Sequence, residues 1–361
     1  MTVTGGSADS FAGFLKHAGL VPVLAPPANE SADPPVTVIW QPGLALLERL
    51  GLYRPVVGRG RTLSTLDCLT TGQSWSADIE GRPTLVAIDR STLQRLVDTQ
   101  VRDQVRTTSC AVTAVESSPS GVRATFDSGV TEPFDAAVTA ARSSLAAEDT
   151  NAGQNIHMWT FEWPTELSSP DGPTEAWTET AAAFTVPVAG NSHVHLVTTA
   201  EIPAAAAVSA DDIADRFGHL FSSTANPLSV RTGDGFEYRR VPNLAPLSRS
   251  QGHTAPIGGA ARAALPGSHL GPTLDIEAAW TLADALAYGP AAVDDALDAY
   301  ERRRRRRAAR VWGHDLDLWE TSQERRLSPA LQHLLFARRI AFSHVLNGEQ
   351  SALVRDVPES L

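Results

Sequence analysis

Two histidines, His193 and His195, are separated by one residue in a segment whose alternation predicts a strand. Because side chains two positions apart on a strand share a face, the two imidazoles are expected to lie together. Imidazole is a common metal ligand, but a zinc site needs at least three protein ligands. The spacing identifies no third ligand, and His157 and His269 have no recognisable partner either. We therefore expect no metal, and we interpret His193 and His195 as an ordinary pair with satisfied hydrogen bonds.

A run of arginines, Arg302 to Arg307, could contact the phosphates of a nucleic acid. Acidic residues on the same expected helix favour another interpretation, because they balance the positive charge. These residues are Asp294, Asp295, Asp298 and Glu301. We expect a solvated helix face and no nucleic-acid partner. No Ser-His-Asp, Cys-His or paired-carboxylate arrangement can be assembled from the spacing of the chain.

The elements that would position these groups follow from hydrophobic periodicity and turn residues. Residues 2–24 predict a strand, a helix from Phe11 to Gly19 and a second strand, which together make a βαβ opening. The remaining first half predicts a loop at 25–37, a helix at 42–52, strands within 61–88, a helix at 91–105 capped by Asp89 or Ser91, and strands at 111–115, 122–126 and 136–138.

The second half changes from strands to helices. Strand patterns dominate from Ile156 to about Arg240, with one helix from Ala210 to Phe221. From Asp275 the chain is expected to be helical almost to its end, with a break near Pro329. No internal repeat is visible, which excludes a solenoid or a propeller. The order of elements predicts an α/β protein.

The most specific pattern is Ile257-Gly258-Gly259-Ala260-Ala261-Arg262, continued by Pro266, Gly271 and Glu277-Ala278-Ala279. It resembles the G-D-A-A-H-P-x-x-P-x-x-G-x-G signature of the FAD-dependent aromatic hydroxylases, which are para-hydroxybenzoate hydroxylase-like flavoprotein monooxygenases. Other segments follow the family in order: Gly5-Gly6 at the glycine-rich turn, Trp40 to Leu52, Ile88-Asp89-Arg90 with Leu93 and Leu96, Asp135 to Arg142, and Ala299 to Arg302.

This resemblance implies a Rossmann-like FAD/NAD(P)-binding domain with an inserted β-sheet substrate domain and a C-terminal helical segment. The FAD-binding domain would be discontinuous and comprise residues 1–60, 85–150 and 245–310. Residues 61–84 and 151–244 would form the substrate domain, and residues 311–361 the C-terminal helices. The resemblance places FAD against Gly5, Gly6, Arg90, Gly258, Pro266 and Gly271.

The chain departs from the family at positions that would touch the cofactor. The family's ribose-binding Glu is Ala25, its ribityl-binding Asp is Gly259, and the first Gly of its closing G-x-G is His269. Ser7 and Ser10 replace two glycines of the first turn, and Ala141-Arg142 replaces Asp-Gly. For Gly5-Gly6 we favour a tight turn that binds no ligand, and for Arg90 a helix-start arginine paired to Asp89 or solvent. We expect FAD binding to be weak or lost.

Two functions remain open. An active protein would resemble its relatives in reducing FAD with NAD(P)H and inserting oxygen into a small organic substrate. The alternative is a non-catalytic relative, a pseudoenzyme that serves as a binding or scaffold protein through the old substrate cavity or a homodimer face. No catalytic residue can be assigned, because the flavin supplies most of the chemistry in this family.

Composition limits the environment and the partners. The 361 residues are 42% hydrophobic and 20% charged, and no apolar run approaches a membrane span. Cys68 and Cys110 lie in no CxxC motif, and no signal peptide is recognisable, so we expect a cytoplasmic protein. The net charge of -11 argues against nucleic-acid and anionic-membrane partners. Lys16 is the only lysine, and every other cationic side chain of the Lys/Arg type is arginine. GC-rich coding or a halophilic adaptation would explain the excess of acidic residues.

If the acidic excess is halophilic, the protein should melt at a higher temperature in molar salt than in dilute buffer. Screening by salt would remove the repulsion among its carboxylates. Thermal melts across that salt range test this expectation. A melting temperature that does not change with salt would leave GC-rich coding as the explanation.

Overall fold

The structure is a computed structural model. It describes residues 2–3, 6–26, 35–70, 73–78, 85–101, 103, 105–140, 156–164, 172–177, 181–188, 190–198, 200, 202, 208–221, 227–228, 235–241, 250–258, 269, 271–289 and 292–304.

A parallel sheet joins the start of the chain to a segment some 250 residues later. Its strand order is β18-β12-β1-β2-β8, and every pairing is parallel. The strands are β1 (Thr2–Val3), β2 (Val23–Ala25), β8 (Arg106–Thr107), β12 (Ala137–Thr139) and β18 (Thr254–Pro256). Helix α1 (Gly6–His17) connects β1 to β2, which confirms the predicted βαβ opening.

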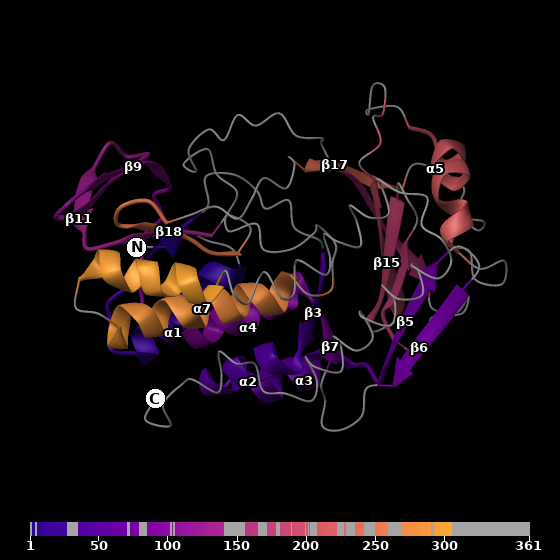
Figure 1. Cartoon of the computed structure of the whole chain (residues 1–361), viewed down its shortest axis with the longest axis horizontal. Helices are drawn as coiled ribbons and strands as arrows, with labels where there is room; N and C mark the ends of the chain where they lie inside the picture. The colour runs from indigo at the N-terminus through magenta and orange to yellow at the C-terminus, as the bar shows by residue number, and fades with distance from the viewer. Residues whose placement is uncertain are drawn as a thin grey trace.

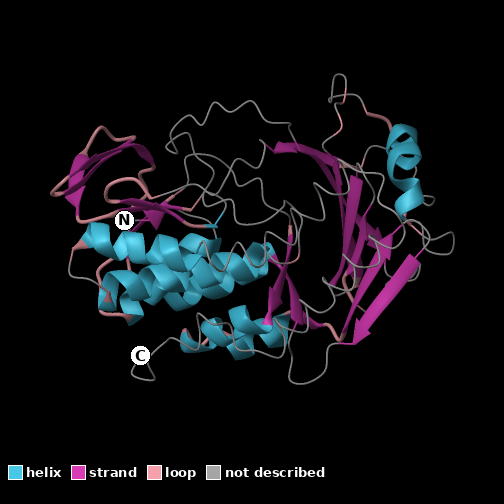
Figure 2. Cartoon of the chain, viewed as in Figure 1, coloured by secondary structure: helices cyan, strands magenta, loops and turns pink. Residues whose placement is uncertain are grey.

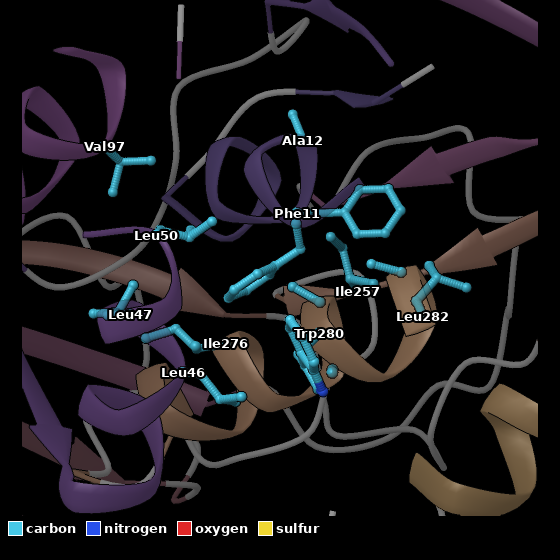
Figure 3. Packing of buried hydrophobic residues seen from close by; sticks show 14 of the residues in the cluster. Phe11, Ala12, Leu46, Leu47, Leu50, Val97, Ile257, Ile276, Trp280 and Leu282 are labelled. Atoms are coloured by element: carbon cyan, nitrogen blue, oxygen red, sulfur yellow. The ribbon is translucent and has the colours of Figure 1, made fainter. Parts of the chain in front are cut away.

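Helices pack beside this sheet and form the largest core. Helices α4 (Arg90–Val101) and α7 (Gly271–Tyr288) flank α1, and α2 (Gln41–Arg49) packs against α7 (Figure 1). Helix α7 begins at Gly271, one turn before the predicted Asp275. The Phe14 ring meets the Trp280 ring edge-on, with centroids 5.1 Å apart. Trp280 lies among aliphatic side chains such as Ile276 and Leu282 (Figure 3). Burial of this apolar area stabilises the layer.

A small antiparallel sheet lies between the helices and the large sheet. Its order is β3-β7-β4, from β3 (Val36–Trp40), β7 (Leu85–Asp89) and β4 (Arg61–Thr62). Strand β3 starts inside the segment predicted as a loop at 25–37, because the run Val36 to Trp40 is buried at every position. A short helix, α3 (Tyr53–Arg59), follows α2 and was not predicted.

The largest sheet has seven strands in the order β17-β13-β16-β15-β14-β5-β6. Its neighbours pair antiparallel, except for the parallel pair β14 and β5. The strands are β5 (Thr65–Thr70), β6 (Gln73–Asp78), β13 (Ile156–Pro164), β14 (Thr174–Trp177), β15 (Ala181–Val188), β16 (Asn191–Thr198) and β17 (Glu237–Val241). Figure 2 shows this sheet standing beside the helical layer.

Two smaller units complete the described chain. Helix α5 (Ala210–Phe217) covers the far face of the large sheet and ends in a 3-10 turn, η4 (Gly218–Leu220), so it is shorter than predicted (Figure 1). The Ser209 hydroxyl accepts the Asp212 N–H as an N-cap. A three-stranded antiparallel sheet is formed by β9 (Val112–Ser118), β10 (Gly121–Phe126) and β11 (Thr131–Phe134).

A helix over residues 293–304 ties the end of the described chain to β18. The Tyr300 hydroxyl donates to the Pro256 carbonyl at 2.7 Å, and burial raises the pKa of Tyr300. The Glu301 carboxylate accepts from Ser250 and forms an ion pair with Arg304 at 3.0 Å. Arg304 is only 3% exposed, so the expectation of a solvated arginine face is wrong at this residue. Its guanidinium is needed inside as the partner of Glu301.

Replacement of Arg304 by Ala should therefore lower the free energy of unfolding by about 3–5 kcal/mol, because it leaves the Glu301 carboxylate buried without its cation. Arg302→Ala is the matched control, since Arg302 is exposed on the same helix and should change stability by less than about 0.5 kcal/mol. Urea denaturation of both variants measures the difference. Equal effects of the two substitutions would contradict the buried ion pair.

Candidate functional site

The two faces of the seven-stranded sheet differ in chemistry. On the outer face, Trp159, Phe161 and Trp163 of β13 join an apolar cluster with Ile213 and Phe217 of α5. Residues of opposite parity on the same strand point the other way, toward the helical layer. We call this second side the inner face; it carries polar groups that are nonetheless buried. Buried polar groups cost free energy unless they have hydrogen-bond partners, so the inner face is a candidate binding site.

One row of paired residues crosses the inner face. Glu175 of β14 pairs with Phe184 of β15, and Phe184 pairs with His195 of β16. His195 pairs with Thr160 of β13, and Thr160 pairs with Glu237 of β17. Directly paired residues point to the same side of a sheet. The row therefore brings together two carboxylates, an imidazole, a hydroxyl and an aromatic ring. Its members are distant in the sequence; Thr160 and Glu237, for example, are 77 residues apart.

His269, just before α7, meets this row from the opposite side. Its Nδ1 lies 3.4 Å from Glu175 Oε1, and the two side chains are 1% and 2% exposed. Its ring meets Phe184 at a steep angle of 72°, with centroids 5.6 Å apart. The Trp40 indole N–H donates to the His269 carbonyl at 3.1 Å. His269 is thus held both through its backbone and through its ring.

Trp40 also fixes the first turn of α7. Its backbone N–H donates to Thr273 Oγ1 at 2.9 Å. Strand β3, which ends at Trp40, is paired with β7. The start of α7 and the small sheet are therefore locked together around the residue that reaches the inner face.

His195 is the least expected member of the row. It is 1% exposed, and within the described part of the chain neither ring nitrogen has a hydrogen-bond partner. Burial, with smaller effects of His269, His193 and Arg239, lowers its pKa to about 3. The ring is therefore neutral at physiological pH and presents one donor and one acceptor. The expectation of a satisfied histidine pair is wrong at His195, because strand alternation shows which face a residue occupies but not what lies opposite.

His193 has a different environment. Its Nε2 lies 3.9 Å from Glu162 Oε1. Burial lowers its pKa, and the charges of Glu162 and Asp89 oppose this shift. Among the residues that the structure describes, no three His, Cys, Asp or Glu side chains come together as metal ligands.

Several positions that the resemblance assigns to FAD lie at the ends of elements. Gly258 follows β18 with φ of +54°, a left-handed conformation that favours glycine. Gly271 opens α7, Arg90 opens α4, and Gly6 opens α1. The Arg90 backbone N–H donates to the Pro35 carbonyl at 2.8 Å. Gly5 and Pro266 lie outside the described residues, as do Gly259, Ala141 and Arg142.

Two described positions differ from what the resemblance expects of an FAD site. Ala25, where the family has its ribose-binding Glu, is fully buried in an apolar cluster with Val112, Val122 and Phe126. His269, where the family has a glycine near the flavin ring, fills the space up to Glu175 and Phe184. By the resemblance, the first change removes the ribose-binding carboxylate, and the second adds a side chain where the signature has glycine.

Similar solved structures have the same fold over nearly the whole chain. Tetracycline destructase Tet(51) is 13% identical and covers 99% of this chain and 98% of its own, with a TM-score of 0.68. A tetrameric form of 2-methyl-3-hydroxypyridine-5-carboxylic acid oxygenase is 20% identical, covers 99% and 97%, and has a TM-score of 0.69. PqsL of P. aeruginosa with 2-aminobenzoylacetate is 18% identical, covers 93% and 98%, and has a TM-score of 0.73.

These matches confirm the predicted α/β fold, in which a helical layer with a parallel sheet stands beside a second, larger sheet. No family model matches the sequence, and no curated protein matches it. No helix of the described part is long and apolar enough to cross a membrane. At these identities the likeness concerns the fold, since one fold serves many functions.

The buried neutral His195 predicts a loss of stability in acid. Its folded-state pKa of about 3 lies below its unfolded value of 6.5, so the unfolded chain binds a proton that the folded chain does not. Stability is therefore full above pH 6.5 and falls between pH 6.5 and about 3. By pH 5 this group alone should cost about 2 kcal/mol.

Denaturation of the wild type and of His195→Phe at pH 7 and pH 5 measures this contribution. The phenylalanine variant has a ring of similar size that does not titrate, so it should lose about 2 kcal/mol less than the wild type between the two pH values. Equal losses in the two proteins would show that His195 binds its proton with an ordinary pKa.

Proposed function

We propose that this chain is a relative of the flavoprotein monooxygenases that no longer holds FAD tightly and that binds a small organic molecule on its inner face. The observation that carries the proposal is the position of His269, whose ring contacts Glu175 and Phe184 where the resemblance expects a glycine beside the flavin ring. Ala25 supports it, because an apolar cluster replaces the ribose contact.

The inner face suits a ligand for a separate reason. The two ring nitrogens of His195 lack partners among the described residues, and leaving such buried groups unpaired costs about 1–3 kcal/mol each. A ligand that hydrogen-bonds to the imidazole recovers this free energy. The Thr160 hydroxyl and the Phe184 ring stand on either side of His195 in the row and would supply a further polar contact and an apolar one.

A second candidate function is that of an FAD-dependent monooxygenase that uses NAD(P)H. The left-handed Gly258 favours it, because this glycine keeps the backbone turn of the signature. Gly271 and Arg90 favour it too, since they open helices at positions that match the family. Both candidates share the proposed division into the discontinuous domain of residues 1–60, 85–150 and 245–310, the sheet domain of residues 61–84 and 151–244, and the segment 311–361. A homodimer is compatible with either.

FAD binding distinguishes the two functions. The contacts that the family makes with FAD are replaced at Ala25, Ser7, Ser10, Ala141 and Gly259. A hydrogen bond that involves a charged group contributes about 1.5–3 kcal/mol to binding. Loss of three such contacts weakens binding by roughly three to six decades. We expect the purified protein to be colourless, and we expect micromolar FAD to show little fluorescence quenching when the protein is titrated into it. A yellow protein with stoichiometric FAD would establish the monooxygenase instead.

A further inference from the structure

The charges of the inner face are mostly negative. Four carboxylates lie on it or beside it: Glu175 and Glu237 in the row, Glu162 two residues from Thr160, and Asp89, whose charge acts on His193. Within the described strands of the seven-stranded sheet, Arg239 is the one lysine or arginine on this face, two residues from Glu237. Arg239 already forms an ion pair with Glu237. A bound anion would therefore find no arginine or lysine of this sheet that lacks a carboxylate partner.

The His269 imidazole is also engaged. The His269 ring lies 3.4 Å from the Glu175 carboxylate, with both side chains buried. A buried anion without a cation loses its hydration and gains no compensating partner. The site consequently offers little to a ligand that carries a carboxylate.

His195 offers a different kind of recognition. Its neutral ring can donate through one nitrogen and accept through the other. Burial keeps the ring uncharged, since its pKa is lowered to about 3. The two nitrogens point away from each other, so one amide meets one of them, either through its carbonyl at the ring N–H or through its N–H at the other nitrogen. In both cases the matching group is uncharged. The Phe184 ring next to His195 favours a flat ligand.

We infer that the inner face selects uncharged planar amides over the corresponding carboxylates, and that Glu175 is the residue that sets this preference. The inference rests on the proposed function. Glu175 lies two strands from His195 in the row, which is about 10 Å at the usual strand spacing. Repulsion between two unit charges at this distance weakens anion binding roughly tenfold at an effective dielectric constant of about 20.

Benzamide and benzoate are suitable probes, because they have the same shape and differ in charge. Dissociation constants for the full chain can be measured by NMR titration at pH 7. We expect benzamide to bind the wild type at least roughly tenfold more tightly than benzoate. In Glu175→Gln this ratio should fall about tenfold, since the substitution removes one negative charge whether or not His269 is protonated.

Two variants make the result specific. Glu116→Gln removes the same charge from an exposed position on β9, outside the large sheet, and should leave the ratio unchanged. His195→Phe removes both ring nitrogens and should weaken benzamide more than benzoate. Retention of the benzamide preference in Glu175→Gln would overturn the role of Glu175.

The outcomes also separate the inference from the proposed function. Benzoate binding that is as tight as benzamide binding would overturn the inference and leave a small-molecule site intact. Failure of both probes to bind would overturn the proposed ligand site and the inference with it. A flavin-loaded protein that still prefers benzamide would support the inference while contradicting the loss of FAD.

Discussion

The contact between His269 and Glu175 is the interaction on which the arrangement of the site depends. It joins the head of α7 to the middle of the seven-stranded sheet, and both groups are almost completely buried. Removing either partner would leave a polar or charged group in a low-dielectric interior, where it costs several kcal/mol. The Trp40 indole holds the His269 backbone from the small sheet, so three units of the fold converge on one imidazole.

The scaffold around this contact is stabilised by packing between its helices. Phe11, Phe14 and Trp280 pack in an aliphatic core that is continuous from α1 to α7. The Tyr300, Glu301 and Arg304 contacts secure β18 from the other side. Many different sequences can supply such packing, and the fold is shared over nearly the full length of structures that are 13–20% identical to this chain.

Local pattern was sufficient to predict the βαβ opening, the strands of the large sheet and the helix after Gly271. These elements have a clear hydrophobic period, and turns or glycines bound them. Strand β3 was missed because all five of its residues are buried and show no alternation, and Arg304 was misjudged because its partner Glu301 also belongs to a charged run.

The site itself was only partly accessible to prediction. The sequence showed His195 only as part of an ordinary histidine pair and His269 as a departure from the resembled signature. Their environment depends on contacts between residues 175, 184, 195 and 269. Such contacts come from sheet register and from the packing of distant elements, and a single sequence contains no period that reports them. The one signal that pointed to the site was a substitution, a histidine where the resembled signature has glycine.

Gly258 has a structural role that does not depend on a ligand. With φ of +54° and a buried position directly after β18, the residue is confined by backbone sterics alone. A side chain here would strain the turn that leads out of the sheet, whether or not a dinucleotide lies nearby. Selection for folding would therefore preserve this glycine in descendants that had abandoned the coenzyme. In such lineages, positions that carry a cofactor-binding carboxylate would indicate a loss of binding more clearly than the glycine does. Backbone conformation does not require a carboxylate, so that residue can change once the cofactor is lost.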